Sequence, residues 1–348
     1  MNLSWHRVVL PLARPFSISR GTRTQQSSLY VELEHDGVTG FGEVAENSFY
    51  GHTLDSIIES LEKSRPYLSL YANNDPADVW NDLSQVMDGD MFALSALDIA
   101  AHDLKGKQKG LPTWQDWGLE WDTVCPSSFT IGIDSIPNMV EKMEEKSGWA
   151  AFKIKLGTDH DLEIVQALRH ASDATFRVDA NCGWTVEQVV EYSKVLADLG
   201  VEFIEQPLSV DATDAEKLEA FEKSSLPIIA DENCQIRSDV EQCAGYFHGI
   251  NIKIAKCGGL SPALEMVKLG KQLDLKVMVG CMIESSVGIS GAAQLLPLLD
   301  FADLDGAVLL RDEPAKGVQL ENGRVVRPTL AGCGAKIDFD RMGQFQVE

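Results

Sequence analysis

The sequence predicts an α/β fold built around a parallel barrel, and three observations carry this prediction. From about residue 127, short runs rich in β-branched residues alternate with helical stretches eight times, as in a closed parallel barrel rather than an open sheet. The last run is followed by a turn-rich tail in which we expect no helix. The 348 residues suffice for such a barrel and an additional lobe. We therefore expect a (β/α)7β TIM-like barrel with an α+β capping domain.

The first third of the chain has the pattern of the additional lobe. The segment "SSLYVELEHDGVTGFGEV" alternates apolar and polar residues around Asp36 and Gly37, which is typical of an antiparallel hairpin. The segment "SALDIAAHDLKGKQKG" has apolar residues at helical spacing, and "LPTWQDWG" then indicates a boundary near residue 120. We expect a capping domain over residues 1–122, the barrel over 123–316, and a C-terminal segment over 317–348 that returns to the capping domain.

Ionisable residues stand at the ends of the expected barrel strands. The strands are "SSFTIGI", "AFKIKLG", "FRVDAN", "VEFIEQPL", "PIIADEN", "GINIKIAKCGG", "KVMVGCMIESS" and "FADLDG". Their terminal ionisable residues are Lys153, Lys155, Asp179, Glu205, Asp231, Lys253, Glu284, Asp303 and Asp305. From Lys155 to Lys253 they recur about one strand–helix unit apart, so they should gather at the carboxyl ends of the strands. Active sites of parallel barrels are built at that end.

Three of these residues, Asp179, Glu205 and Asp231, form a candidate metal site on adjacent strands. Buried like charges repel one another unless a cation lies among them. Three hard oxygen ligands with open positions suit Mg²⁺, which keeps water and substrate ligands. None of the seven histidines falls at an expected strand end, which disfavours a zinc site and a histidine base. The candidate bases are therefore lysines.

The lysines of "AFKIKL" and "NIK" indicate a proton-transfer reaction. Lys153 and Lys155 share one face of the second strand, and Lys253 ends the sixth strand. In a closed ring of eight strands, the second and sixth lie opposite each other, so Lys155 and Lys253 should face one carbon from two sides. One lysine could then remove a proton and the other return it, through a metal-stabilised enediolate, which is the geometry of racemisation or epimerisation. The positive charges of Lys153 and the metal should favour the neutral, basic form of Lys155.

Composition excludes several classes of partner. Asp and Glu outnumber Lys and Arg by 53 to 30, and a net charge of −23 repels nucleic acids and anionic lipid surfaces. The seven cysteines include no CxxC pair, and no signal-peptide pattern or bilayer-length apolar run is present in the sequence. We expect a cytoplasmic protein with a small-molecule substrate, and the sequence leaves a homo-oligomer open.

As a set, these motifs resemble the enolase superfamily and, within it, the muconate-lactonising subgroup. The resemblance covers nearly the whole chain and rests on the KxK strand, "VDAN", "EQP", "ADE", "NIKIAKCGG" and "MIESS". "FADLDG" resembles the element with which dipeptide epimerases hold the substrate's α-ammonium group, although Asp305 could also be a turn residue before Gly306. "FSISRGTRT" resembles the capping loop that covers the substrate. The resemblance implies these substrate-binding residues: Lys153, Asp303, Asp305, Glu284, Arg20, Arg23 and Thr130.

The function that this resemblance implies is a Mg²⁺-dependent dipeptide epimerase that inverts the α-carbon of the C-terminal residue. Other members of the subgroup are the alternative, namely a cycloisomerase, an N-acylamino acid racemase or an o-succinylbenzoate synthase. From a different class, an inactive barrel could serve as a binding or structural protein. The presence of all three carboxylates and both facing lysines argues against an inactive barrel.

Overall fold

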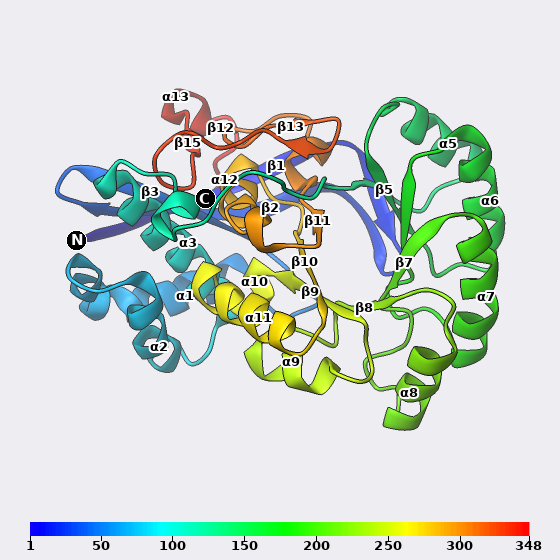
Figure 1. Cartoon of the computed structure of the whole chain (residues 1–348). Helices are drawn as coiled ribbons and strands as arrows, with labels where there is room; N and C mark the ends of the chain where they lie inside the picture. The colour runs from blue at the N-terminus through cyan, green and yellow to red at the C-terminus, as the bar shows by residue number, and fades with distance from the viewer. Residues whose placement is uncertain (348) are drawn as a thin grey trace.

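The computed structural model describes residues 1–347, and its N-terminal part is an antiparallel sheet with helices packed on it (Figure 1). The sheet has the order β1-β2-β3 and consists of β1 (Asn2–Ile18), β2 (Gly21–His35) and β3 (Val38–Ala45). Asp36 and Gly37 connect β2 to β3 with φ angles of 53° and 77°, the left-handed conformation that a tight hairpin turn requires. The predicted hairpin is confirmed.

The helices of the N-terminal part cover this sheet. They are α1 (Leu54–Ser64), η1 (Arg65–Ala72), α2 (Pro76–Val86), α3 (Met91–Lys109) and α4 (Thr113–Asp116). The predicted long helix is α3, which ends at Gly110 in the left-handed conformation. It packs so closely on β3 that a Cβ atom at Gly42 would lie 1.9 Å from the carbonyl oxygen of Ala96. Glycine at this position therefore permits the contact between helix and sheet.

Eight parallel strands form the second part of the chain. They are β4 (Phe129–Ile131), β5 (Ala151–Lys155), β6 (Thr175–Asp179), β7 (Val201–Glu205), β8 (Ile228–Ala230), β9 (Gly249–Lys253), β10 (Lys276–Gly280) and β11 (Phe301–Asp303). Neighbours in the chain are neighbours in the sheet, and a bridge between Ser127 and Ala302 joins the two ends of the sheet. Seven of the strands lie within the predicted runs, and β6 begins one residue before its run, at Thr175, so the predicted barrel is confirmed.

Helices surround the barrel on its outer side (Figure 1). They are α5 (Ile136–Glu144), α6 (Asp161–Ala171), α7 (Val186–Asp198), α8 (Asp214–Lys223), α9 (Arg237–Cys243), α10 (Ile254–Cys257), α11 (Leu260–Gln272) and α12 (Ser286–Ala293). A single apolar core joins strand residues such as Ile154 and Val178 to helix residues such as Val165 and Val189. Side chains alternate along a strand, and Ile154 of β5 points outward into this core. Its two neighbours in the strand, Lys153 and Lys155, therefore point toward the barrel interior.

The last part of the chain contacts the first strand. After η2 (Leu296–Leu298) and β11 come η3 (Gly306–Leu309), β12 (Ala315–Lys316), β13 (Leu320–Glu321), β14 (Arg324–Val325), β15 (Lys336–Ile337) and α13 (Phe339–Met342). The backbone N–H of Val9 donates to the carbonyl of Phe345 at 2.9 Å. The expectation of a tail without a helix is wrong at α13, a single turn begun by the side chain of Asp338. The domain bounds at residues 122 and 316 stay a prediction.

No helix within residues 1–347 combines the length and the apolar character that crossing a lipid bilayer demands.

Glu43 on β3 connects the N-terminal sheet to the barrel. Its buried carboxylate accepts hydrogen bonds from the backbone N–H of Ser285, at 3.0 and 3.1 Å to its two oxygens, and from the N–H of Gly288 at 3.0 Å. The Ser285 hydroxyl also donates to it. Because Ser285 is the N-cap of α12, the carboxylate lies at the positive end of the helix dipole. This contact fixes the two parts of the molecule against each other.

Glu43→Ala should lower the free energy of unfolding by about 3 kcal/mol, because buried donors at the start of α12 would lose their acceptor. Glu43→Gln keeps one carbonyl acceptor and should cost less. Urea denaturation followed by circular dichroism measures both changes. The matched control is Glu34→Ala, since Glu34 lies in the same sheet with an exposed carboxylate. Equal losses in Glu43→Ala and Glu34→Ala would contradict the role given to Glu43.

Candidate active site

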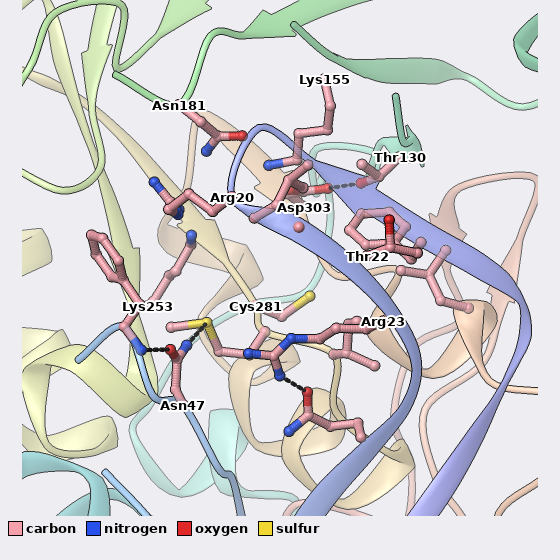
Figure 2. A pocket seen from close by; sticks show the side chains of 18 of the residues that line it. Arg20, Thr22, Arg23, Asn47, Thr130, Lys155, Asn181, Lys253, Cys281 and Asp303 are labelled. Atoms are coloured by element: carbon pink, nitrogen blue, oxygen red, sulfur yellow. Dashed lines mark hydrogen bonds between the residues drawn. The ribbon is translucent and has the colours of Figure 1, made fainter. Parts of the chain in front are cut away.

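A cavity of about 500 Å³ lies at the carboxyl ends of the barrel strands, between the barrel and loops of the N-terminal part (Figure 2). The barrel contributes Thr130, Lys153, Lys155, Asn181, Lys253, Asp303 and Asp305 to its lining. The N-terminal part contributes Ile18, Arg20, Arg23, Asn47, Phe49 and Tyr50, among others. Most of the residues singled out at strand ends therefore line one cavity.

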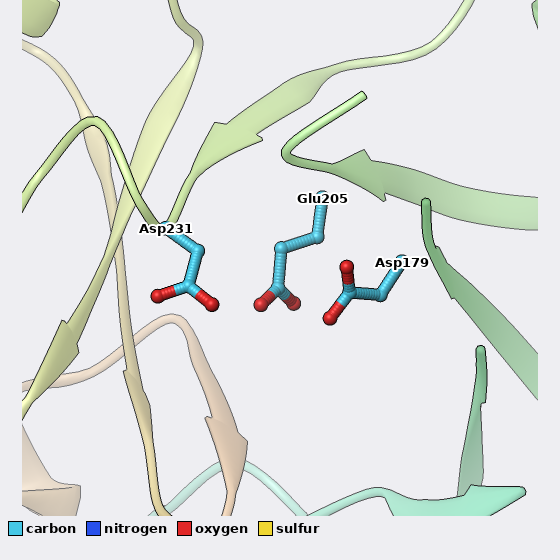
Figure 3. A group of neighbouring side chains, drawn as sticks. All are labelled: Asp179, Glu205 and Asp231. Atoms are coloured by element: carbon cyan, nitrogen blue, oxygen red, sulfur yellow. The ribbon is translucent and has the colours of Figure 1, made fainter. Parts of the chain in front are cut away.

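Three buried carboxylates lie side by side beside this cavity (Figure 3). Asp179 ends β6, Glu205 ends β7 and Asp231 directly follows β8. One oxygen of each lies within 4.8 Å of the others. Asp179 and Glu205 are paired in the register of β6 and β7, so equal positions on adjacent strands bring the carboxylates together. A set of three hard oxygen donors at this spacing fits Mg²⁺.

The pKa values of the three carboxyl groups shift in different directions: those of Asp179 and Asp231 are lowered, and that of Glu205 is raised. Burial raises the pKa of Glu205 to about 7; Lys153 opposes the rise, and the charges of Asp179 and Asp231 add to it. Burial acts in the same direction on Asp179, but Lys155 and Lys153 outweigh it and lower the pKa of that carboxyl group. A cation bound among the three groups would relieve the repulsion felt by Glu205.

Lys153 is surrounded by carboxylates. Its Nζ lies 2.8 Å from both oxygens of Glu205, 3.1 Å from Asp179 and 3.0 Å from Asp303. Burial lowers the pKa of Lys153, but Asp303, Glu205 and Asp179 outweigh it and raise the pKa well above its usual value. These contacts offset the charge of Lys153, and the effect on Lys155 expected from Lys153 together with the metal stays a prediction.

The two candidate bases each contact one carboxylate of the cluster. Lys155 Nζ donates to Asp179 at 2.6 Å, and Lys253 Nζ donates to Asp231 at 2.7 Å. Burial lowers the pKa of Lys253, whereas Asp231 and Tyr50 raise it, and the net change is upward. The lysines stand on β5 and β9, the second and sixth strands of the barrel. Figure 2 shows their side chains entering the cavity from different sides.

Asp303 and Asp305 form an acidic wall on the β11 side of the cavity. Asp303 accepts hydrogen bonds from the hydroxyl groups of Ser128 at 3.1 Å and Thr130 at 3.4 Å. Asp305 accepts the backbone N–H of Thr130 at 2.6 Å. Burial, followed by the charge of Asp303, raises the pKa of Asp305 to about 7. Two adjacent buried carboxyl groups of this kind favour a cationic ligand group.

The remaining predicted site residues differ in position. Glu284 is buried and is not among the residues that line the described cavity; burial, followed by Glu43, raises its pKa to about 8. Its contact with a substrate stays a prediction. Arg23 lines the cavity and donates to Gln26 Oε1 at 2.5 Å. Arg20 also lines the cavity, and its Nη2 lies 2.9 Å from Glu232 Oε1.

Two residues that support the cluster were not predicted. Asn251 Nδ2 donates to Glu205 Oε1 at 2.9 Å, and Lys256 Nζ donates to Asp231 Oδ1 at 2.5 Å and to its carbonyl oxygen at 2.6 Å. Asn251 stands two residues before Lys253, so strand alternation could have placed it on the same face. Lys256 lies beyond the strand in α10, where no such periodicity applies.

Family models match both parts of the chain. Residues 3–118 match the mandelate racemase / muconate lactonizing enzyme N-terminal domain, and residues 138–341 match the enolase C-terminal domain-like model. Together the two matches cover most of the 348 residues.

Individual relatives agree with these models. An L-Ala-D/L-amino acid epimerase from Maribacter sp. is 46% identical over 97% of this chain and 100% of its own length. The crystal structure of a dipeptide epimerase from Cytophaga hutchinsonii, complexed with Mg and D-Ala-L-Val, has a TM-score of 0.91 and 25% identity, over 99% of this chain and 97% of that one. An N-succinyl Arg/Lys racemase from Bacillus cereus has a TM-score of 0.90 and 26% identity, over 99% and 97%. The chain belongs to the mandelate racemase and muconate-lactonising family of the enolase superfamily.

Proposed function

We propose that the protein is a Mg²⁺-dependent dipeptide epimerase that inverts the α-carbon of the C-terminal residue. The observation that carries this proposal is the position of Lys155 and Lys253, on the second and sixth barrel strands, at one cavity beside three buried carboxylates. Inversion requires a proton acceptor on one face of a carbon and a proton donor on the other. Two lysines on opposite strands supply that pair.

The chain's own residues would carry the proton as follows. One lysine, neutral at the start, takes the α-proton; the C–H electron pair stays on the substrate, and the other lysine's ammonium group forms the new C–H bond on the opposite face. Asp179, Glu205 and Asp231 would hold Mg²⁺, which would supply positive charge to stabilise the negative charge that develops on the substrate carboxylate. Lys153 adds a fixed positive charge between Glu205 and Asp303.

The acidic wall formed by Asp303 and Asp305 supports a substrate with a free amine. An α-ammonium group at the far end of a dipeptide would meet these carboxylates, whereas an acylated amine would bring no positive charge to them. The Maribacter relative is named an L-Ala-D/L-amino acid epimerase, so dipeptides that begin with L-alanine are the first substrates to test. An N-acylamino acid racemase, the main alternative, would prefer N-succinylated amino acids.

The test is incubation of a dipeptide library in D₂O with Mg²⁺, followed by mass spectrometry and chiral analysis. We expect one deuterium per molecule at the C-terminal α-carbon, together with formation of the epimer. N-succinylated amino acids form a parallel set in the same assay. If the enzyme turned over the N-succinylated amino acids but none of the dipeptides, this result would contradict the proposal and favour the racemase alternative.

Asp305→Asn should lower kcat/KM for dipeptides by about ten- to hundredfold, because one charge-assisted hydrogen bond to the ammonium group is lost. Asp303→Asn should lower it at least as much, since Asp303 also contacts Lys153. Steady-state kinetics measures both effects, and Mg²⁺ affinity of Asp305→Asn should stay nearly unchanged.

The control for this prediction is a dipeptide whose amine is acetylated. It should be a poor substrate of the parent enzyme and lose much less on mutation of Asp305. Equal activity of the parent enzyme on acetylated and free dipeptides would contradict the role given to this acidic wall.

We also propose a cytoplasmic location, which the seven free cysteines support because thiols persist in a reducing compartment. Self-association into a homo-oligomer stays a prediction, and light scattering coupled to size-exclusion chromatography would measure it.

A further inference from the structure

Arg20 connects three separate segments above the cavity. It lies in the tip between β1 and β2, and its Nη2 lies 2.9 Å from Oε1 of Glu232, in the loop that follows β8. Its guanidinium also stacks on the ring of Phe49, 4.3 Å from the ring centroid. Phe49 belongs to the loop between β3 and α1, so Arg20 joins both N-terminal loops to the barrel.

The environment of Glu232 makes this ion pair different from a surface pair. The side chain of Glu232 is 1% exposed, and it follows directly after Asp231 of the candidate metal site. A buried carboxylate beside other carboxylates requires a nearby cation, and the loss of that cation is costly because the remaining charge stays buried. Arg20 supplies such a cation from the N-terminal part of the molecule, and Lys253 supplies another from the barrel.

We propose that Arg20 is a positioning residue that holds the β1–β2 tip over the cavity through Glu232 and Phe49, rather than a residue that recognises the substrate. This inference rests on the proposed function for the identity of the substrate, but the contact itself does not. Both the charge and the flat face of the guanidinium are engaged by protein groups.

Two other arginines of the same hairpin serve as comparisons. Arg14 also reaches the barrel, where it pairs with Glu145, but both side chains are 45% exposed. Exposed pairs of this kind contribute little to stability. Arg23 lines the cavity like Arg20, yet its described hydrogen bond is to Gln26 in its own strand. Neither arginine should therefore hold the tip against the barrel as Arg20 does.

The first experiment is hydrogen–deuterium exchange of the substrate-free protein with Mg²⁺ present. Arg20→Met and Glu232→Gln should each speed amide exchange in residues 16–24 by about tenfold, since loss of the contact favours local opening. The double variant should exchange no faster than Arg20→Met, because that variant already lacks the contact with Glu232. Arg14→Met and Arg23→Met should exchange in this segment at the parent rate. Parent rates in Arg20→Met and Glu232→Gln would overturn the proposal, whether or not the protein proves to be an epimerase.

The second experiment separates positioning from substrate recognition. With a dipeptide substrate, Arg20→Met and Glu232→Gln should each raise KM, by about tenfold, and the double variant should match Arg20→Met. Arg20→Lys keeps the charge and should recover part of the loss. If Arg20→Met raised KM while Glu232→Gln kept the KM of the parent enzyme, Arg20 would contact the substrate directly. That result would overturn the positioning role. Absence of turnover in the parent protein would reject the proposed function and leave the exchange experiment as the test of the contact.

Discussion

Lys155→Ala and Lys253→Ala should each reduce epimerisation by at least about 10²- to 10⁴-fold, the range that one general acid or base contributes. Inversion needs a proton acceptor on one face of the α-carbon and a proton donor on the other, so neither lysine can replace its partner. Chiral chromatography of the dipeptide after incubation measures the loss. The matched control is Lys276→Ala, because Lys276 lies at the opposite end of a barrel strand with an exposed side chain. This control should turn over at the parent rate.

Each lysine variant should still exchange one α-proton with solvent. In D₂O, Lys155→Ala should incorporate deuterium into one epimer and Lys253→Ala into the other, since each keeps the base on one face of the substrate. Mass spectrometry of the separate L,L and L,D dipeptides measures this preference. If both variants labelled the same epimer, the two lysines would not act on opposite faces, and the proposed mechanism would be wrong.

The strand-end residues could be predicted from two repeats in the sequence. Side-chain alternation tells which residues of a strand point into the barrel, and the strand–helix repeat tells where each strand ends. These rules locate Asp179, Glu205 and Asp231 without any knowledge of contacts, and the structure brings them within 4.8 Å of one another. The same rules place Lys155 and Lys253 on the second and sixth strands.

The loops and the ion pairs could not be predicted in the same way. The charge of Lys153 is offset by Asp303, which lies on β11, and such a contact leaves no local pattern in the sequence. Glu232 and Phe49, the partners of Arg20, lie in irregular segments where no periodicity applies. The single turn of α13 is too short for a helical repeat to appear.

Glu205→Gln should remove the binding of Mg²⁺ while leaving the fold intact. The variant loses one of three anionic ligands, and the loss of affinity should reach at least about 100-fold, the upper end of what an outer-shell partner contributes. Isothermal titration calorimetry with Mg²⁺ measures the affinity. Epimerase activity should disappear together with metal binding. Glu187→Gln is the matched control, because Glu187 is exposed in the first turn of α7 and should keep both properties.

The stability of the same variant distinguishes a metal ligand from a structural residue. Burial and the neighbouring carboxylates disfavour the charge on Glu205, so its neutral replacement should not lower the melting temperature of the metal-free protein. The parent protein should melt at a higher temperature when Mg²⁺ is added, because the ion binds the folded state, whereas Glu205→Gln should not respond. Lys153 would still be held by Asp179 and Asp303 in the variant. A melting temperature of Glu205→Gln that still rises with Mg²⁺ as in the parent would mean that the ion binds elsewhere, and the assignment of the three carboxylates would fail.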